Sequence, residues 1–334
     1  MGYIKLNKKA FFHNLDYFSS ICNGKEKISL ALKDNAYGHG ILEIASLAKE
    51  YGIEDVFVRD IREASMIKQF KFNSILVLYD IPTQVDNNII VSVNSLFSLK
   101  KIPNNSKIEL KLDTGMNRNG IVQAEIIDAI KIIKEKNLIL NGIFTHFCCA
   151  DEDNNITKYQ EKIFLNLIND FKNDFKNFRI HCAASSGVHK VDMNLYNIAR
   201  IGIGAYGYLD LEEEKYLSPV LSLWGEKIST KKLKKDDHVG YGSNPFIAPC
   251  NMIVSNYNVG YGDGFFRFSE NKKATIADNR AILGRVSMDS LSVSGDDEHI
   301  CIFNNVSAIA KANNTIKYEV LASLNPNIQK IIVS

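Results

Sequence analysis

The chain of 334 residues is longer than one hydrophobic core usually supports, so we expect two domains. Its composition, 46% hydrophobic and 23% charged residues, is that of an ordinary globular protein, and a net charge of +2 argues against a nucleic-acid partner. The sequence has no apolar run long enough to span a bilayer, so we expect no membrane partner. The six cysteines show neither Cys-x-x-Cys spacing nor a small-domain disulfide framework, which indicates reduced thiols in a cytoplasmic protein.

Short apolar runs alternate with amphipathic stretches through the first two thirds of the chain. The expected strands are Ile28–Leu32, Asp55–Val58, Ser74–Leu78, Asn88–Val93, Lys107–Leu112, Gly142–His146, Arg179–Ala183 and Asn197–Arg200. Helical periodicity covers several stretches between them, such as Ile41–Tyr51, Ala124–Lys136 and Lys158–Phe171. Because strand and helix alternate, the sequence predicts an α/β fold with an N-terminal (β/α)8 TIM-type barrel over residues 1–217. An open doubly wound sheet is the alternative.

The pattern changes after Gly207, where short alternating runs separated by turn residues replace the helical stretches. The expected strands are Val220–Ile228, Met252–Val259, Lys273–Ala277, Ala281–Val286, Ile300–Phe303 and Ile331–Val333. A short helix is expected at Tyr318–Leu324. Residues 218–334 are therefore predicted to form a C-terminal, mostly antiparallel β domain.

The stretch Ala31–Gly40 combines a strand end with a polar corner that contains two glycines. Lys33 stands where the apolar run ends. A lysine at the mouth of a buried strand is desolvated, which disfavours its charged form and makes the amine a better nucleophile. Such an amine can form a Schiff base with a carbonyl compound, although a solvated strand-end lysine is the commoner case.

Polar side chains recur where other predicted strands end, and barrel enzymes place their active residues at that position. These residues are Lys111, Arg118, His146, His181, Ser185 and Arg200. The loops after the last two strands of a barrel often bind phosphate, and there Ser185 offers a hydroxyl while Gly202 and Ile203 offer backbone N–H groups. Arg118, beside a glycine corner, can hold a carboxylate bidentately, although a surface ion pair is the simpler role for a lone arginine.

Three short motifs in this chain also occur in proteins of other functions. Asp113-Thr114-Gly115 matches the aspartic-protease triplet, but that chemistry needs two carboxylates and the chain has one copy. Gly202–Gly207 matches G-x-G-x-x-G, but it does not open a helix inside a βαβ unit, so it is a weak dinucleotide signal. The stretch His146–Asp151, with two adjacent cysteines, matches no common zinc spacing, and we expect no metal.

Taken together, the motifs resemble those of the alanine racemases, a family that binds pyridoxal 5'-phosphate (PLP). The matching segments are Ala31–Gly40, Lys111–Gly120, Thr145–Phe147, Arg200–Gly207, Val239–Gly242, Val259–Arg267, Gly284–Asp289 and Tyr318–Leu324. The resemblance implies an enzyme that interconverts L- and D-alanine with two bases on opposite faces of the substrate and supplies D-alanine for peptidoglycan. It also implies a homodimer with shared active sites.

The resemblance implies catalytic roles for particular residues. Lys33 would hold PLP as a Schiff base and act as one base, and Tyr241 of the partner subunit would be the other, supported by His146. Arg200 would face the PLP pyridine nitrogen, braced by His181. Because an arginine does not readily give up its proton, the ring would be a weaker electron sink than one paired with Asp.

The same resemblance implies binding roles. Arg118 would bind the substrate carboxylate, and Lys111, which is carbamylated in some members, would orient Arg118. Met288 of the partner subunit and Tyr261 of the partner subunit would line the pocket and its entrance. The phosphate of PLP would be bound by Tyr37, Ser185, Gly202, Ile203 and Tyr318.

The chain also departs from the family pattern. Asp34 replaces the small residue common after the cofactor lysine, Ala184 stands where an asparagine usually precedes the phosphate-binding serine, and the chain is rather short. A serine racemase or a broader specificity stays open, because one small group changes selectivity by only about 1–3 kcal/mol. A non-catalytic PLP carrier and a related decarboxylase are further alternatives; the β domain with Tyr241 counts against the carrier, and Arg200 counts against the decarboxylase.

Overall fold

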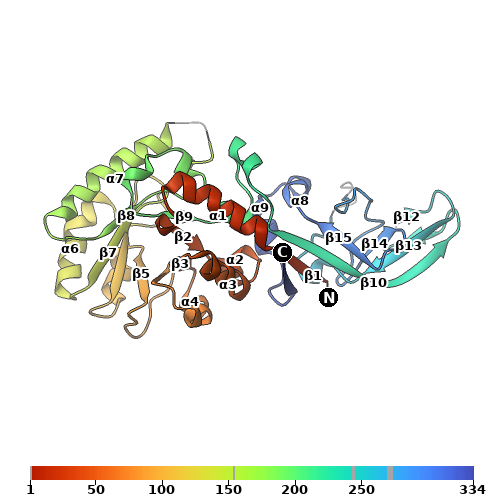
Figure 1. Ribbon diagram of the computed structural model, residues 1–334, viewed down its shortest axis with the longest axis horizontal. Coiled ribbons are helices and arrows are strands. Elements are labelled where there is room, and N and C mark those ends of the chain that lie inside the picture. Colours follow the sequence, from red (N-terminus) through yellow and green to blue (C-terminus); the bar gives the residue numbers. More distant parts are fainter. Residues whose placement is uncertain (1, 153–154, 243–244, 269–273) are drawn as a thin grey trace. The chain divides into compact units, whose positions relative to one another are not determined.

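The computed structural model describes residues 2–152, 155–242, 245–268 and 274–334, and Figure 1 shows its helices and strands. Contacts within the chain divide it into two compact units. One comprises Ala10–Ala36 and Ile44–Ser218, and the other comprises Met1–Lys9, Tyr37–Glu43 and Pro219–Ser334. The second unit thus includes two short segments from the N-terminal part of the sequence. The division into domains at residues 217 and 218 stays a prediction.

The first unit is a barrel of parallel strands. Among the described residues its sheet has eight strands, in the order β8-β7-β6-β5-β4-β3-β2-β9. They are β2 (Ile28–Ala31), β3 (Asp55–Val58), β4 (Ser74–Val77), β5 (Ile89–Val93), β6 (Lys107–Lys111), β7 (Ile139–Phe144), β8 (Arg179–His181) and β9 (Ala199–Ile201). Just after β8, Ala184 forms a bridge with Arg200, and the Arg200 N–H donates to the Ala183 carbonyl at 3.0 Å, which closes the ring. The TIM-type barrel is therefore confirmed, and the open doubly wound sheet is excluded.

Helices cover the barrel with apolar faces at helical spacing. The predicted helices correspond to α3 (Ile41–Tyr51), α6 (Ile126–Glu135) and α7 (Ile156–Lys172). In α6 the side chains of Ile126, Ala129 and Ile133 are buried, which is the periodicity that predicted the helix. Further helices are α1 (Lys8–Cys22), α4 (Ile61–Ile67) and α5 (Leu96–Lys101). The segment labelled α2 (Lys33–Tyr37) has left-handed backbone angles at residues 34–37 and is a turn rather than a right-handed helix. Within the described ranges no helix is long and apolar enough to cross a membrane.

In the described part of the chain two crossovers of the barrel contain no α-helix, and the one from β8 to β9 has only the short 3-10 turns Gly187–His189 and Met193–Leu195. Residues 78–88, all of them described, connect β4 to β5 without a helix. Pro82 and the Asp86-Asn87-Asn88 run explain this, because both favour turns over a continuous helix. The barrel therefore has the expected strands but lacks some of the helices that would join them.

The second unit contains a mixed, mostly antiparallel sheet. In the described part of the chain, its order is β14-β13-β10-β1-β16, and β15 also pairs with β10. The strands are β1 (Tyr3–Asn7), β10 (Leu221–Leu233), β13 (Met252–Tyr257), β14 (Leu291–Ser294), β15 (His299–Phe303) and β16 (Gln329–Val333). Among the described strands of this sheet, only β1 and β16 pair in parallel. A separate pair joins β11 (His238–Val239) to β12 (Phe246–Ile247), and the helices are α8 (Ser307–Asn313) and α9 (Lys317–Ala322).

The predictions for this unit were partly right. Strands lie at β10, β13, β15 and β16, and a helix lies at α9. The expected strand Ala281–Val286 is wrong: the segment makes only the single bridges Thr275–Ala281 and Ile282–Val293. Its alternation reflects buried Leu283 and Val286 in an irregular segment rather than a ladder. Residues 274–277 likewise form no strand, and Lys273 lies outside the described residues.

Candidate active site

Positive charge gathers at the carboxyl end of the barrel strands. Lys33 follows β2, Lys111 ends β6, and Arg200 lies in β9. Between them lies His146, whose pKa is lowered to about 3, first by burial and then by the charges of Arg200, Lys111, Arg118 and Lys33. A neutral imidazole among four cations indicates a site prepared for an anionic ligand.

Lys33 is placed by a left-handed turn. Residues 34–36 have φ angles of 54°, 54° and 52°, and φ stays positive through Tyr37. Each such non-glycine residue costs about 1–2 kcal/mol, so the surrounding structure must hold the turn in place. Buried Glu63 does so, because one of its carboxylate oxygens accepts the Asn35 N–H at 3.0 Å and the other accepts the Arg59 N–H at 2.9 Å.

The Lys33 amine lies at the accessible mouth of the barrel. Its Nζ is 3.0 Å from Oδ2 of Asp34, and the lysine side chain is 28% exposed. Nη1 of Arg59 lies 3.1 Å from the other oxygen of Asp34. A partly exposed ion pair of this kind is weak, so the amine can exchange its partner for a ligand.

Arg200 is buried and its guanidinium is held by acceptors on several sides. Nη1 lies 2.7 Å from Nδ1 of His181. Nη2 donates to the carbonyl of Thr145 at 2.7 Å and to that of Cys182 at 3.2 Å. The guanidinium carbon lies 5.0 Å from the centre of the Phe144 ring. Burial lowers the pKa of Arg200 to about 10, which still leaves a cation at neutral pH.

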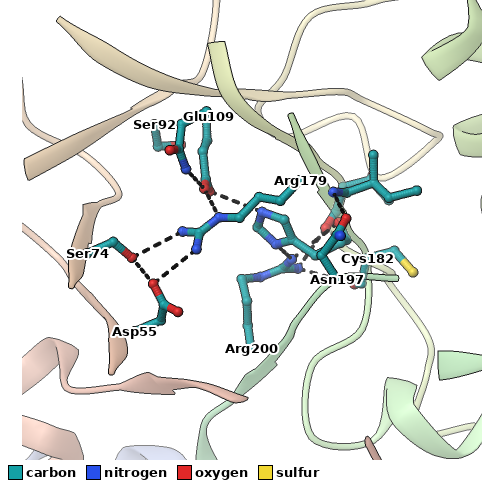
Figure 2. Close-up of polar contacts among 12 residues, drawn as sticks. Asp55, Ser74, Ser92, Glu109, Arg179, Cys182, Asn197 and Arg200 are labelled. Carbon is teal, nitrogen blue, oxygen red and sulfur yellow. Dashed lines mark hydrogen bonds and ion pairs between the residues drawn. The ribbon is translucent and has the colours of Figure 1, made fainter. Parts of the chain in front are cut away.

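Figure 2 shows a network of polar side chains that continues from Arg200 into the barrel. Nε2 of His181 lies 3.0 Å from Oε2 of Glu109, and Arg179 pairs with the other oxygen of Glu109. Nη1 of Arg179 is also 3.1 Å from Asp55, which in turn hydrogen-bonds Ser74. Of these residues, His181 was predicted from its place in a strand, whereas Glu109, Arg179 and Asp55 were not predicted.

Ser185 and two glycines form a small polar corner after β8 and β9. The Ser185 hydroxyl oxygen accepts the Gly202 N–H at 2.9 Å and the Gly204 N–H at 3.2 Å. A Cβ at Gly204 would lie 2.3 Å from the ring of Phe18, so the backbone fits here only as glycine. The short turn Ile203–Tyr206 follows at once. Because its oxygen accepts these two N–H groups, the Ser185 hydroxyl can donate its own proton to an anion such as phosphate.

Lys111 and Arg118 lie on the segment that follows β6. Lys111 is only 6% exposed, and its pKa is lowered to about 8 by burial and by the charges of Arg118 and Arg200. The loop between them is folded by Asp113, whose Oδ1 accepts the N–H of Gly115 at 2.9 Å and that of Asn117 at 3.1 Å. Asp113 thus organises a turn, and the exposed Arg118 is free to reach a carboxylate.

The remaining predicted site residues belong to the second unit. The rings of Tyr37 and Tyr318 pack edge to face, with centroids 5.7 Å apart. Tyr261 and Met288 lie on adjacent segments, because the N–H of Tyr261 donates to Ser287 at 3.0 Å and the next N–H donates to Met288 at 2.8 Å. Tyr241 is 61% exposed.

The candidate metal stretch shows no ligand geometry. The sulfurs of Cys148 and Cys149 lie 3.1 Å apart, and Gln160 accepts the Cys148 N–H at 3.0 Å. In the part of the chain that the structure describes, no group of three or more His, Cys, Asp or Glu side chains could hold a metal ion.

The first unit thus combines an accessible amine, a buried guanidinium and a hydroxyl–amide corner on adjacent strands. Lys33 follows β2, Ser185 follows β8, and Arg200 lies in β9. In the ring, β9 lies between β2 and β8. An amine can condense with a carbonyl group, the corner can bind phosphate, and the cations can bind carboxylates. The site therefore suits a phosphorylated carbonyl compound together with an anionic substrate.

Comparison with known proteins gives matches along the whole chain. Residues 6–210 match the family described as alanine racemase, N-terminal domain, and residues 220–332 match alanine racemase, C-terminal domain. The chain is 38% identical to an alanine racemase of Campylobacter curvus, with all of both chains covered. It is also 38% identical to an alanine racemase of Nitratiruptor, with 99% of each chain covered.

Solved structures share the fold. An alanine racemase of Clostridium difficile is 24% identical, with a TM-score of 0.88 over 99% of this chain and 95% of that one. A histidine racemase from Leuconostoc mesenteroides is 24% identical, with a TM-score of 0.85 over 100% of this chain and 98% of that one. The same fold therefore occurs in racemases named for different amino acids.

Proposed function

Since this chain belongs to the alanine racemase family, whose members depend on PLP, we propose that it interconverts L- and D-alanine and supplies D-alanine for peptidoglycan. The observation that carries the proposal is the convergence of Lys33, Arg200 and Ser185 from the adjacent strands β2, β9 and β8. We further propose that the enzyme works in the cytoplasm.

The residues of the barrel fit PLP. Lys33 would bind it covalently, Arg200 would face its ring nitrogen, and the corner of Ser185, Gly202 and Ile203 would hold its phosphate. When bound, PLP withdraws electrons from the α-carbon of an amino acid and makes the α-proton acidic. The guanidinium of Arg200 stays charged and donates a hydrogen bond to His181. The ring nitrogen of PLP would therefore accept a hydrogen bond from a group that does not readily transfer its proton. Tyr37 and Tyr318 are proposed to bind the phosphate as well.

Racemisation requires proton transfer on both faces of the substrate. We assign one face to the Nζ of Lys33 and the other to the hydroxyl of Tyr241 of the partner subunit in a homodimer. The high exposure of Tyr241 in a single chain supports this assignment, because a residue that acts in the active site of a partner subunit must be accessible. His146, whose pKa is lowered by burial and by the surrounding cations, is proposed to accept a hydrogen bond and so support that tyrosine.

Substrate binding follows from the cations near the barrel mouth. Arg118 is proposed to bind the α-carboxylate, which a guanidinium recognises bidentately. Lys111 is proposed to orient Arg118. Met288 of the partner subunit and Tyr318 would restrict the space for the side chain, which favours alanine. Tyr261 of the partner subunit would line the entrance. Because the fold alone does not select the side chain, a serine or broader specificity is the second candidate, and the similarity to a histidine racemase supports keeping it.

The test is racemisation of L-alanine by the purified protein with added PLP, followed by circular dichroism. We expect loss of optical activity that depends on PLP, and the Lys33→Ala variant should lose both the activity and the visible absorbance of bound PLP. PLP absorbance without racemisation of alanine, serine or other amino acids would favour the non-catalytic carrier. Absence of the absorbance from the wild-type protein would overturn the assignment of Lys33.

A further inference from the structure

The interior of this barrel is charged, where side chains of Val, Ile and Leu usually fill such barrels. Glu109 of β6 and Arg179 of β8 point toward one another across β7 and form an ion pair (Figure 2). Gly142 of β7 makes this possible, because a Cβ there would lie 2.9 Å from both side chains. Glu109 is fully buried, and Asn141 also donates to its Oε1 at 3.1 Å. The ion pair between β6 and β8 therefore depends on a glycine at position 142 of the strand between them.

The network determines where the proton of His181 lies. Arg200 has only donors, so Nδ1 of His181, 2.7 Å from Nη1 of Arg200, must carry a lone pair. The imidazole proton is therefore on Nε2, where it donates to Oε2 of Glu109 at 3.0 Å. Burial lowers the pKa of His181 to about 4, which agrees with a neutral ring.

Arg179 keeps Glu109 in the form that can accept this proton. Burial alone would raise the pKa of Glu109, but the charge of Arg179 and the hydrogen bonds from His181 and Arg179 lower it well below its ordinary value. Arg179 is in turn fixed by Asp55 at 3.1 Å and by Ser74 at 3.4 Å. The carboxylate is thus ionised and rigidly oriented.

We propose that Glu109 is a positioning residue that acts through His181 on Arg200. By accepting the Nε2 proton, it fixes the imidazole tautomer whose Nδ1 accepts from the guanidinium. The inference rests on the proposed function, in which Arg200 faces the ring nitrogen of PLP. Glu109 itself contacts neither cofactor nor substrate.

The competing explanation is that Glu109 only neutralises Arg179. Two double variants separate the explanations, because both remove the ion pair and differ only in the acceptor offered to His181. In Glu109→Gln with Arg179→Met, the amide oxygen can turn toward Nε2 of His181. In Glu109→Met with Arg179→Met, no acceptor remains. Removing both charges also avoids an unpaired buried arginine, which would threaten folding.

The experiment compares kcat and KM for L-alanine and the visible circular dichroism of bound PLP in the PLP-loaded variants. We expect the variant with glutamine to keep kcat within about threefold of wild type and to keep its visible band, since the acceptor is retained. The variant with methionine should lose about 10- to 100-fold in kcat, the loss typical of outer partners of an active-site group, with KM little changed and the band altered. Equal behaviour of the two variants would overturn the proposal.

Two controls complete the design. Ile108→Val changes the neighbouring buried residue of β6, whose side chain points away from Glu109, and should leave the band and kcat unchanged. If neither double variant folds, ¹⁵N NMR of histidine-labelled, PLP-loaded wild type decides: a neutral His181 with the proton on Nε2 is expected, and a proton on Nδ1 overturns the proposal. A wild type that binds PLP but racemises nothing would overturn the proposed function, while the band and the NMR signal still test Glu109.

Discussion

The Nζ of Lys33 lies 3.0 Å from a carboxylate oxygen of Asp34, the residue that follows it in the chain. The other oxygen of Asp34 lies 3.1 Å from Arg59, so the carboxylate is shared between two cations. The ion pair occupies the amine that would bind PLP. Condensation of the amine with a carbonyl group breaks this ion pair, so Asp34 opposes the step by which PLP would be bound.

Replacing Asp34 with Ala should therefore strengthen PLP binding. A partly exposed ion pair contributes about 1 kcal/mol or less, which corresponds to an increase in affinity of up to about fivefold. The measurement is a titration of the visible absorbance with PLP. Glu54→Ala, which breaks the partly exposed pair of Lys49 and Glu54 at 2.8 Å, is the matched control and should change nothing. Weaker binding in Asp34→Ala would instead mean that the carboxylate helps to place the amine.

Tyr241→Phe should separate the two faces of the substrate. The variant should bind PLP normally and exchange the α-proton of D-alanine, while removal of the α-proton of L-alanine nearly ceases, because only the phenol hydroxyl is lost. Exchange in deuterated water, followed by proton NMR, measures each enantiomer separately. Tyr159→Phe, at a comparably exposed tyrosine of α7, is the control. Full exchange of L-alanine by Tyr241→Phe would refute the two-base assignment.

The barrel was predictable because its strands are buried on both faces. β2 and β4 read as short apolar runs, and all their residues are buried. The second unit was harder, since pairing there depends on distant segments: β1 lies beside β10 and β16, which are more than two hundred residues away. The apolar residues of 281–286 alternate as a strand would, but they pack as an irregular segment, and periodicity alone does not distinguish the two.

The site was predictable where a residue stands at a strand end. Lys33, Lys111 and Arg200 share that position, and their meeting at one edge follows from parallel strands. Glu109 lies two residues before Lys111, on the same face of β6. The sequence does not reveal that Arg179 reaches Glu109 across Gly142. The tautomer of His181 likewise depends on contacts between strands far apart in the chain.

Lys111 should react with carbon dioxide. Its pKa of about 8 leaves roughly a tenth of the amine neutral at pH 7, and a carbamate would replace a buried cation beside Arg118 and Arg200 with an anion. We expect a carbamate signal in ¹³C NMR of protein incubated with ¹³C-bicarbonate. The signal should be absent from Lys111→Gln, whose KM for alanine should rise about tenfold as Arg118 loses its partner. A signal that persists in Lys111→Gln would assign the carbamate to another amine.

His181 should make the protein less stable in acid. Burial, with the charges of Arg200 and Arg179, lowers its pKa to about 4 from an ordinary value of 6.5, although Glu109 opposes the shift. Between pH 6.5 and pH 4, the imidazole of His181 is therefore protonated in the unfolded chain and neutral in the folded protein. The linkage relation gives a loss of about 2 kcal/mol in the free energy of unfolding between pH 7 and pH 5.

Urea unfolding of the PLP-free protein at pH 7 and pH 5 measures this loss. In His181→Gln the difference between the two pH values should shrink by about 2 kcal/mol, because the titrating imidazole is gone. His13→Gln, at an exposed histidine of α1, should keep the wild-type difference. If His181→Gln also keeps the wild-type difference, His181 has the same pKa in the folded and unfolded protein. Its imidazole would then become protonated in the folded protein, which contradicts the neutral ring that donates to Glu109 and accepts from Arg200.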